Sequence, residues 1–190
     1  MKLLFHFAYT NFSNTYVVGP EEPGNAILID PGVMDIQLLD LIEYHHYYVK
    51  YILATHAHKG HINGMGTIRK IYKADLYSGS ESIFDVPSHR LQHGDRINLD
   101  GIEVEAIGVP GHTGNSLAYK INNMIFTGDA LSAGTVGSTV HNIAEELNIK
   151  SIREKILSLD ESNLIFPGHG PPSSVKIERR FNPFLGGESV

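Results

Sequence analysis

A histidine-rich run follows directly on an apolar segment, and it restricts the fold of this chain more than any other feature. Residues 51–54 read Y-I-L-A and residues 55–61 read T-H-A-H-K-G-H. The apolar segment is typical of a buried strand, and side chains two positions apart in an extended segment point to the same side. His56 and His58 can therefore bind one cation together. The fold must then bring further ligands to the end of this strand.

Three later motifs can supply those ligands. Each places a histidine or an aspartate just after a β-rich or apolar stretch: Pro110-Gly111-His112, Thr127-Gly128-Asp129 and Pro167-Gly168-His169. The chain has no cysteine, so imidazole and carboxylate groups must hold any metal. The sequence therefore predicts a metal site built from nitrogen and oxygen ligands.

The order and context of these residues resemble the metallo-β-lactamase superfamily, whose pattern is H-x-H-x-D-H followed by His, Asp and His. Residues 111–116, 126–129 and 167–171 read G-H-T-G-N-S, F-T-G-D and P-G-H-G-P. They are most similar to the glyoxalase II group, the hydroxyacylglutathione hydrolases. Residues 178–185 resemble the short bacterial members that lack the helical substrate domain. The resemblance extends from residues 29–32 to the tail, and it implies an α/β fold, a four-layer αββα sandwich of metallo-β-lactamase type.

Strand and helix patterns alternate along the chain and favour one domain over residues 1–190. We expect strands at 1–9, 15–18, 26–29, 51–54, 74–77, 96–99, 102–107, 117–121, 124–127 and 163–166. Helices are expected after Asp35 with Ile36, Leu39 and Ile42 on one face, from Asn63 with Met65, Ile68 and Tyr72, and through Ile152, Ile156 and Leu159. Asp100-Gly101 and Asn122-Asn123 predict hairpin turns, and the glycine-rich residues 133–137 predict a tight turn near the site.

The resemblance implies two neighbouring metal positions. The first would use His56, His58 and His112. The second would use His61, Asp129 and His169, with Asp129 able to bridge because each carboxylate oxygen can bind one cation.

Gly60 departs from the family pattern, because it stands where the family has an aspartate that binds the second metal. We therefore expect one firm metal position and one weak or empty position. Ser138 and Val140 stand where glyoxalase relatives carry an arginine and an acidic residue. Asp30, in Asp-Pro-Gly after a strand, matches a family position close to the metals, although turn chemistry explains it equally well.

Composition narrows the partners. The formal net charge is -6 and there is no basic block beyond residues 178–180, which argues against nucleic acid. No stretch approaches the roughly 20 apolar residues of a membrane span. Residues 1–9 are more typical of a strand than of a signal peptide, so we expect a cytoplasmic protein. No Gly-x-Ser-x-Gly motif is present, so a serine triad has no candidate.

The predicted function is that of a metal-dependent hydrolase acting on a small thioester or related acyl substrate. Metal-bound hydroxide would attack the carbonyl, and Asp129 would hold the nucleophile in place. The expected cofactor is one or two zinc ions, with iron or manganese as alternatives. Two other functions stay open. One is a mononuclear iron enzyme resembling persulfide dioxygenases, and the resemblance implies one of His56 or His58, with His112 and Asp129, as its ligands. The other is a non-catalytic metal-binding or sensing protein, for which Gly60, Ser138 and Val140 are the arguments.

Overall fold

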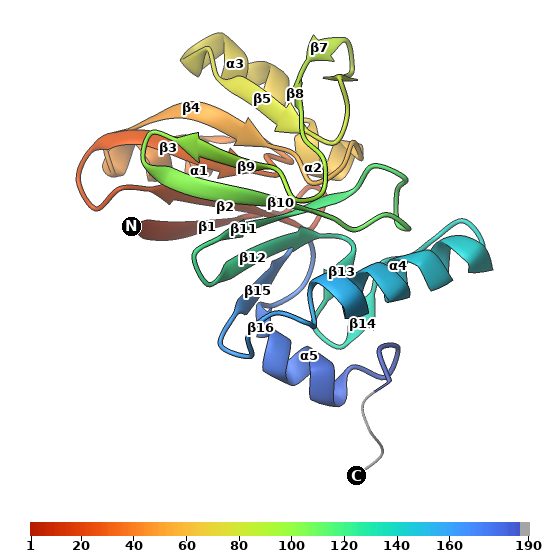
Figure 1. Cartoon of the computed structure of the whole chain (residues 1–190). Coiled ribbons are helices and arrows are strands. Elements are labelled where there is room, and N and C mark those ends of the chain that lie inside the picture. The colour runs from red at the N-terminus through yellow and green to blue at the C-terminus, as the bar shows by residue number, and fades with distance from the viewer. Residues whose placement is uncertain (187–190) are drawn as a thin grey trace. The chain divides into compact units, whose positions relative to one another are not determined.

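The computed structural model describes residues 1–186 (Figure 1). Its contacts group into two compact units. The first unit comprises Met1–Leu91 with Leu99–Gly101, and the second comprises Gln92–Asn98 with the described residues 102–186. The organisation of residues 1–190 as a single domain stays a prediction. Within residues 1–186, no helix has the length and apolar character that crossing a membrane requires.

A six-stranded mixed sheet forms the first unit, in the order β1-β2-β3-β4-β5-β8. Its strands are β1 (Lys2–Ala8), β2 (Ser13–Gly19), β3 (Gly24–Ile29), β4 (Tyr47–Leu53), β5 (Asp75–Ser78) and β8 (His89–Arg90). The remaining elements are α1 (Ile36–Tyr44), α2 (Lys59–Ile62), α3 (Met65–Tyr72) and a small hairpin of β6 (Ser82–Ile83) and β7 (Val86–Pro87). Strands β3 and β4 pair in parallel, so their carboxyl ends meet at one edge of the sheet.

Helices α1 and α3 pack against β4 and bury an apolar core. The carboxylate of Asp35 accepts a hydrogen bond from Leu38 N at 2.9 Å and caps α1, as predicted. The buried face of α1 consists of Leu38 and Ile42. Ile36 was expected on that face but is 66 % exposed, because this first helical residue lies two positions before Leu38, and positions two apart do not share a helix face. In α3 the predicted Met65, Ile68 and Tyr72 are the buried residues.

A second six-stranded sheet belongs to the second unit except for its residue Leu99, and its strand order is β16-β15-β12-β11-β10-β9. Its strands are β9 (Arg96–Leu99), β10 (Ile102–Gly108), β11 (Leu117–Ile121), β12 (Met124–Gly128), β15 (Leu164–Pro167) and β16 (Ser173–Ser174). The short hairpin of β13 (Leu131–Ser132) and β14 (Thr135–Val136), with α4 (Asn142–Lys155) and α5 (Val175–Phe181), completes the described part. Strands β12 and β15 pair in parallel, whereas β10, β11 and β12 are antiparallel.

The predicted turns have the expected backbone conformations. Asp100 and Gly101 both adopt positive φ, at 51° and 91°, which a two-residue hairpin of the primed type requires. Asn122 also has a positive φ, at 53°. The glycine-rich loop forms the β13–β14 turn, in which Gly134 has a φ of 74°. Turn chemistry therefore places these strand ends correctly from sequence.

Helix α4 corrects one prediction. The expected helix ran through residues 152–159, but α4 begins at Asn142 and ends at Lys155. His141 is its N-cap, and the imidazole accepts a hydrogen bond from Ala144 N. The first turns of α4 carry Ile143 and Leu147 on an exposed face. They lie on the other side of the helix from the buried Ile152, so the apolar residues of α4 form no single stripe and the sequence pattern revealed only the buried end.

Candidate metal centre

Three histidines of the first unit lie together just beyond the end of β4. The ring centroid of His56 lies 4.6 Å from that of His58 and 4.4 Å from that of His61. His56 and His61 are buried, at 3 % and 1 % exposure. His58 is the N-cap of α2 and has an extended backbone, so the His56 and His58 rings can approach each other as they would in a strand. His61 reaches the same place from inside α2.

Asp30 holds two of these rings through one carboxylate. It follows β3, adopts a φ of 50° and is buried. Oδ1 accepts a hydrogen bond from Thr55 N at 2.8 Å, and Oδ2 accepts one from Thr55 Oγ1 at 2.7 Å. Oδ2 also lies 3.4 Å from Nδ1 of His61. Because β3 and β4 end side by side, the turn after one strand can reach the histidine run after the other.

These contacts determine which nitrogen of each ring carries the proton. The Thr55 hydroxyl donates to the Asp30 carboxylate, so its oxygen must accept from His56 Nδ1, which lies 3.0 Å away. The carboxylate likewise favours a proton on His61 Nδ1. In both rings Nε2 is then the nitrogen that has the lone pair, which is the state that a metal ligand requires. Asp30 is thus both a turn residue and an orienting group of the candidate site.

Tyr16 lies on β2, in the same unit. Burial raises the pKa of the Tyr16 phenol above its ordinary value, and the negative charge of Asp30 raises it further, while a hydrogen bond from Asn14 lowers it. The phenol therefore stays neutral at physiological pH.

Gly60 lies inside α2, so its backbone is helical. Gly60 is not among the glycines with a positive φ, a conformation that an aspartate tolerates only moderately. A Cβ added at Gly60 would have a single neighbour within 4 Å, Asn11 Nδ2 at 3.8 Å, which is ordinary van der Waals contact. The missing aspartate is therefore not excluded by backbone conformation or by crowding at Cβ.

In the second unit, His112, Asp129 and His169 lie together. His169 Nδ1 lies 2.7 Å from Asp129 Oδ1, and His112 Nε2 lies 3.7 Å from Asp129 Oδ2. Each carboxylate oxygen thus faces a different imidazole. His112 Nδ1 lies 2.6 Å from the backbone oxygen of Ser138, which can only accept, so Nδ1 carries the proton and Nε2 has the lone pair. This contact gives Ser138 a role through its backbone that a motif search cannot detect.

The sheet and α4 position these three residues. Asp129 and His169 follow β12 and β15, which pair in parallel and end at the same edge. Gly168 N donates to Gly128 O at 2.8 Å and joins the two strand ends. Gly111 has a φ of 143°, and a Cβ there would lie 2.3 Å from the Cβ of Asn148 on α4. Asn148 Nδ2 also donates to Ala130 O at 3.0 Å, so one helix residue contacts the chain next to both His112 and Asp129.

The donor groups fit a divalent metal ion. Asp30, His56 and His61 each offer one ligand atom, and these atoms lie within 4.8 Å of one another. Imidazole with carboxylate is a ligand set of zinc, iron and manganese. The structure brings His56, His58 and His61 together in the first unit and His112, Asp129 and His169 in the second. Their roles as metal ligands stay predictions.

The chain is similar in sequence to known proteins over most of its length. The sequence matches the Metallo-beta-lactamase superfamily over residues 8–169. An uncharacterized protein of Mycobacterium tuberculosis is 31 % identical, covering 93 % of this chain and 94 % of the relative. The hydroxyacylglutathione hydrolase GloC of Haemophilus influenzae is 28 % identical, covering 89 % of this chain and 91 % of the relative.

Among solved structures, ETHE1 from Myxococcus xanthus aligns with a TM-score of 0.89 at 26 % identity, covering 100 % of this chain and 86 % of that one. The metallo-β-lactamase fold predicted from the sequence is confirmed.

Proposed function

The chain belongs to the metallo-beta-lactamase superfamily, and from this premise we propose that it is a metal-dependent hydrolase acting on a thioester or a related acyl substrate. One observation carries the proposal. Each unit holds a cluster of imidazoles around a carboxylate, and hydrogen bonds fix the ring nitrogen that has the lone pair in His56 and His112. Metal-bound histidines almost always donate their other ring N–H to a carboxylate, a backbone carbonyl or a water in this way.

We further propose that the two clusters serve one centre. The superfamily match begins before the first cluster and ends at His169, the last residue of the second. The first position would use His56, His58 and His112, and the second would use His61, Asp129 and His169. Asp129 would reach both, because its two oxygens already face different imidazoles.

The chemistry divides between the metal and the side chains. A bound divalent ion lowers the pKa of a coordinated water and polarises an acyl carbonyl. Asp30 and Thr55 keep the proton of His56 on Nδ1 and the lone pair on Nε2, and the Ser138 carbonyl oxygen does the same for His112. Asp129 would accept a hydrogen bond from the attacking water and orient it. The thiolate leaving group needs little assistance from a general acid, because the pKa of its conjugate thiol is only about 8.5.

The substrate class comes from the relatives. GloC is named for hydroxyacylglutathione hydrolysis, and it covers nearly the whole chain at 28 % identity. We therefore place S-lactoylglutathione first in a panel of thioesters, followed by acyl thioesters without glutathione. The experiment loads the purified protein with zinc and measures kcat/KM on each. Hydrolysis that is lost in His58→Ala supports the proposal, whereas a metal-loaded protein that hydrolyses no member of the panel would contradict it.

Gly60 provides a sharper test. Gly60→Asp restores the family's carboxylate at a position with room for it, and it should raise occupancy of the second metal and the turnover of thioesters. Gly60→Ala is the matched control, because it adds the Cβ and raises helix propensity without adding a ligand. Equal metal content in the two variants would show that this protein has a different site design.

The iron oxygenase stays a second candidate because of Gly60. A site of two histidines and one carboxylate uses no ligand at position 60, so the absence of a side chain there does not weaken it. Iron-loaded protein assayed for oxygen uptake with glutathione persulfide separates the two activities. Uptake without thioester hydrolysis would favour the oxygenase, and absence of both activities would favour a metal-binding or sensing role.

A further inference from the structure

Asn11 is fixed beside the histidine run by the turn between β1 and β2. Two side chains at this hairpin donate to the backbone oxygen of Gly60: Asn11 Nδ2 at 2.5 Å and Ser13 Oγ at 2.8 Å. Gly32 lies against the same group, since a Cβ there would be 2.1 Å from Gly60 O and 2.7 Å from Asn11 Nδ2. The hairpin, the turn after β3 and α2 therefore meet at the residue that departs from the family pattern.

The other end of the Asn11 amide has no such partner. Oδ1 is buried and accepts no hydrogen bond from any residue between 1 and 186. A buried carbonyl oxygen without a donor is unfavourable, and in native proteins it usually indicates a bound water or ion. Exchanging Oδ1 with Nδ2 does not solve the problem, because two acceptors, Oδ1 and Gly60 O, would then face each other at 2.5 Å. The orientation of the amide is thus set by Gly60, and Oδ1 needs a cation or a donor.

This amide is also the group nearest to the missing side chain. Asn11 Nδ2 is the single heavy atom within 4 Å of the place where a Cβ of residue 60 would lie, apart from the adjoining chain. His61, a proposed ligand of the second metal position, is the next residue. An oxygen supplied from the hairpin can therefore serve the region that the family serves with an aspartate of α2.

We propose that Asn11 Oδ1 is a ligand of the second metal position and replaces the aspartate absent at Gly60. This inference rests on the proposed metal centre. An amide oxygen is a hard neutral ligand, of the kind that manganese and other oxygen-seeking cations accept. It binds a cation less strongly than a carboxylate, and it leaves the centre one charge unit more positive than in relatives with aspartate.

The test measures the affinity of each of two metal equivalents by calorimetry, with Zn²⁺ and Mn²⁺ in parallel. Asn11→Ala should weaken the affinity for the second metal equivalent at least 10-fold and leave the affinity for the first equivalent unchanged. Ser13→Ala is the matched control, because it removes the other hydrogen bond to the same Gly60 oxygen but no metal-binding oxygen of an amide. It should leave the affinities for both equivalents as they are in the wild-type protein.

A second pair of variants makes the test independent of folding defects. In Gly60→Asp protein the new carboxylate should make Asn11 dispensable, so adding Asn11→Ala there should change the second equivalent little. Asn11→Ser keeps a polar turn residue if the alanine variant fails to fold, and it should weaken the second equivalent like alanine. Equal effects of Asn11→Ala and Ser13→Ala would overturn the proposal, since Asn11 would then act only by holding α2. A wild-type protein that binds one equivalent would overturn it as well.

The experiments distinguish failure of the Asn11 ligand assignment from failure of the hydrolase proposal. If the second equivalent depends on Asn11 but no thioester is hydrolysed, the hydrolase proposal fails and the ligand assignment stands. If thioesters are hydrolysed and Asn11→Ala leaves both equivalents unchanged, the ligand assignment fails alone.

Discussion

Replacing Asp30 by asparagine should reverse the hydrogen bonds that orient His56 and His61 while keeping the fold. Thr55 N can only donate, so the oxygen of the new amide must take the place of Oδ1, which accepts from it at 2.8 Å. The amide NH2 then occupies the place of Oδ2 and faces Thr55 Oγ1 and His61 Nδ1. Both must become acceptors. The Thr55 hydroxyl then donates to His56 Nδ1, which moves the His56 proton to Nε2 and removes the lone pair that a metal needs.

The size of the expected loss in metal affinity depends on how many histidine rings lose their orienting partner. Loss of one outer partner of a metal-bound histidine typically lowers metal affinity about 10- to 100-fold, or about 1.4–2.7 kcal/mol. Because Oδ2 orients His61 directly and His56 through Thr55, we expect an effect towards the larger value. Stability should change little, since asparagine tolerates the positive φ of Asp30. Asp30→Ala is different, because it leaves the buried Thr55 N–H without its acceptor, which costs about 1–3 kcal/mol.

Two measurements check this reasoning. Competition with a chromophoric chelator gives the zinc affinity, and ¹⁵N NMR of the histidine rings in metal-free protein reports which nitrogen carries the proton. Thr55→Val is the control that removes the hydroxyl relay to His56 but leaves His61 beside Asp30. An Asp30→Asn protein with the zinc affinity and the ring protonation of the wild type would refute the argument. A metal-free Asp30→Ala protein as stable as the metal-free wild type would refute the expected loss of stability.

Three further outcomes are expected. His58→Ala should remove most bound metal, measured by elemental analysis, and unchanged content would contradict its assignment to the first position. Asp129→Ala should abolish thioesterase and persulfide activities alike, whereas His169→Ala should abolish activity only if the second metal is occupied and catalytic; a fully active Asp129→Ala protein would exclude every enzymatic interpretation given above. Asn148→Ala should lower the melting temperature measured by circular dichroism, because it removes a buried hydrogen bond to Ala130 O that contributes about 1 kcal/mol. The expected decrease is about 2–4 °C for a chain of this length. An unchanged melting temperature would show that α4 does not depend on this contact.

Local signals in the sequence predicted the strands of four or more residues and the histidine motifs, but not the two-residue strands or the contacts that orient the motifs. Apolar runs and Asp-Gly turns depend on neighbouring residues, so the strand ends before His56 and Asp129 were placed correctly. The Asp30 to Thr55 hydrogen bonds depend on parallel pairing of β3 with β4, and no local pattern specifies that pairing. The same holds for Asn11, which reaches Gly60 across 49 positions. Non-local pairing therefore determines the shell around the ligands.

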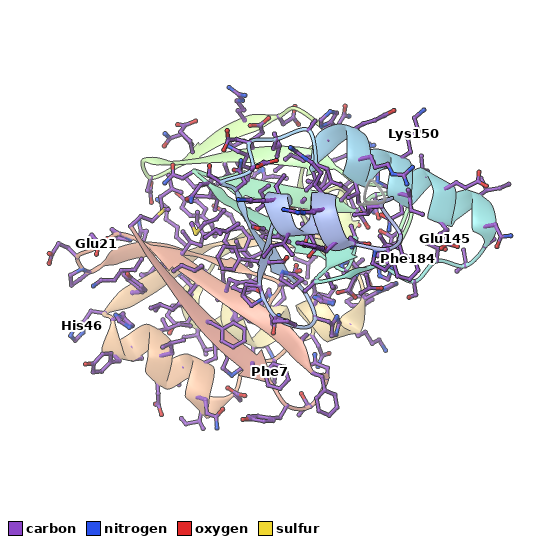
Figure 2. The ribbon with its side chains drawn as sticks, turned by 90° about the horizontal axis from the view of Figure 1, so that it is seen from below. Phe7, Glu21, His46, Glu145, Lys150 and Phe184 are labelled. Carbon is purple, nitrogen blue, oxygen red and sulfur yellow. The ribbon has the colours of Figure 1, made fainter. Side chains whose placement is uncertain are left out.

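The two faces of α4 offer a way to observe the second cluster without touching it. Asn148 is fully buried and contacts the chain next to His112 and Asp129, whereas the Lys150 side chain is 69 % exposed and extends away from the helix (Figure 2). Residues two apart on a helix lie on nearly opposite sides. Because the chain contains no cysteine, Lys150→Cys would create a unique thiol for a fluorophore. Such a label would report displacement of α4 when ions are added, from a position that contributes nothing to their binding.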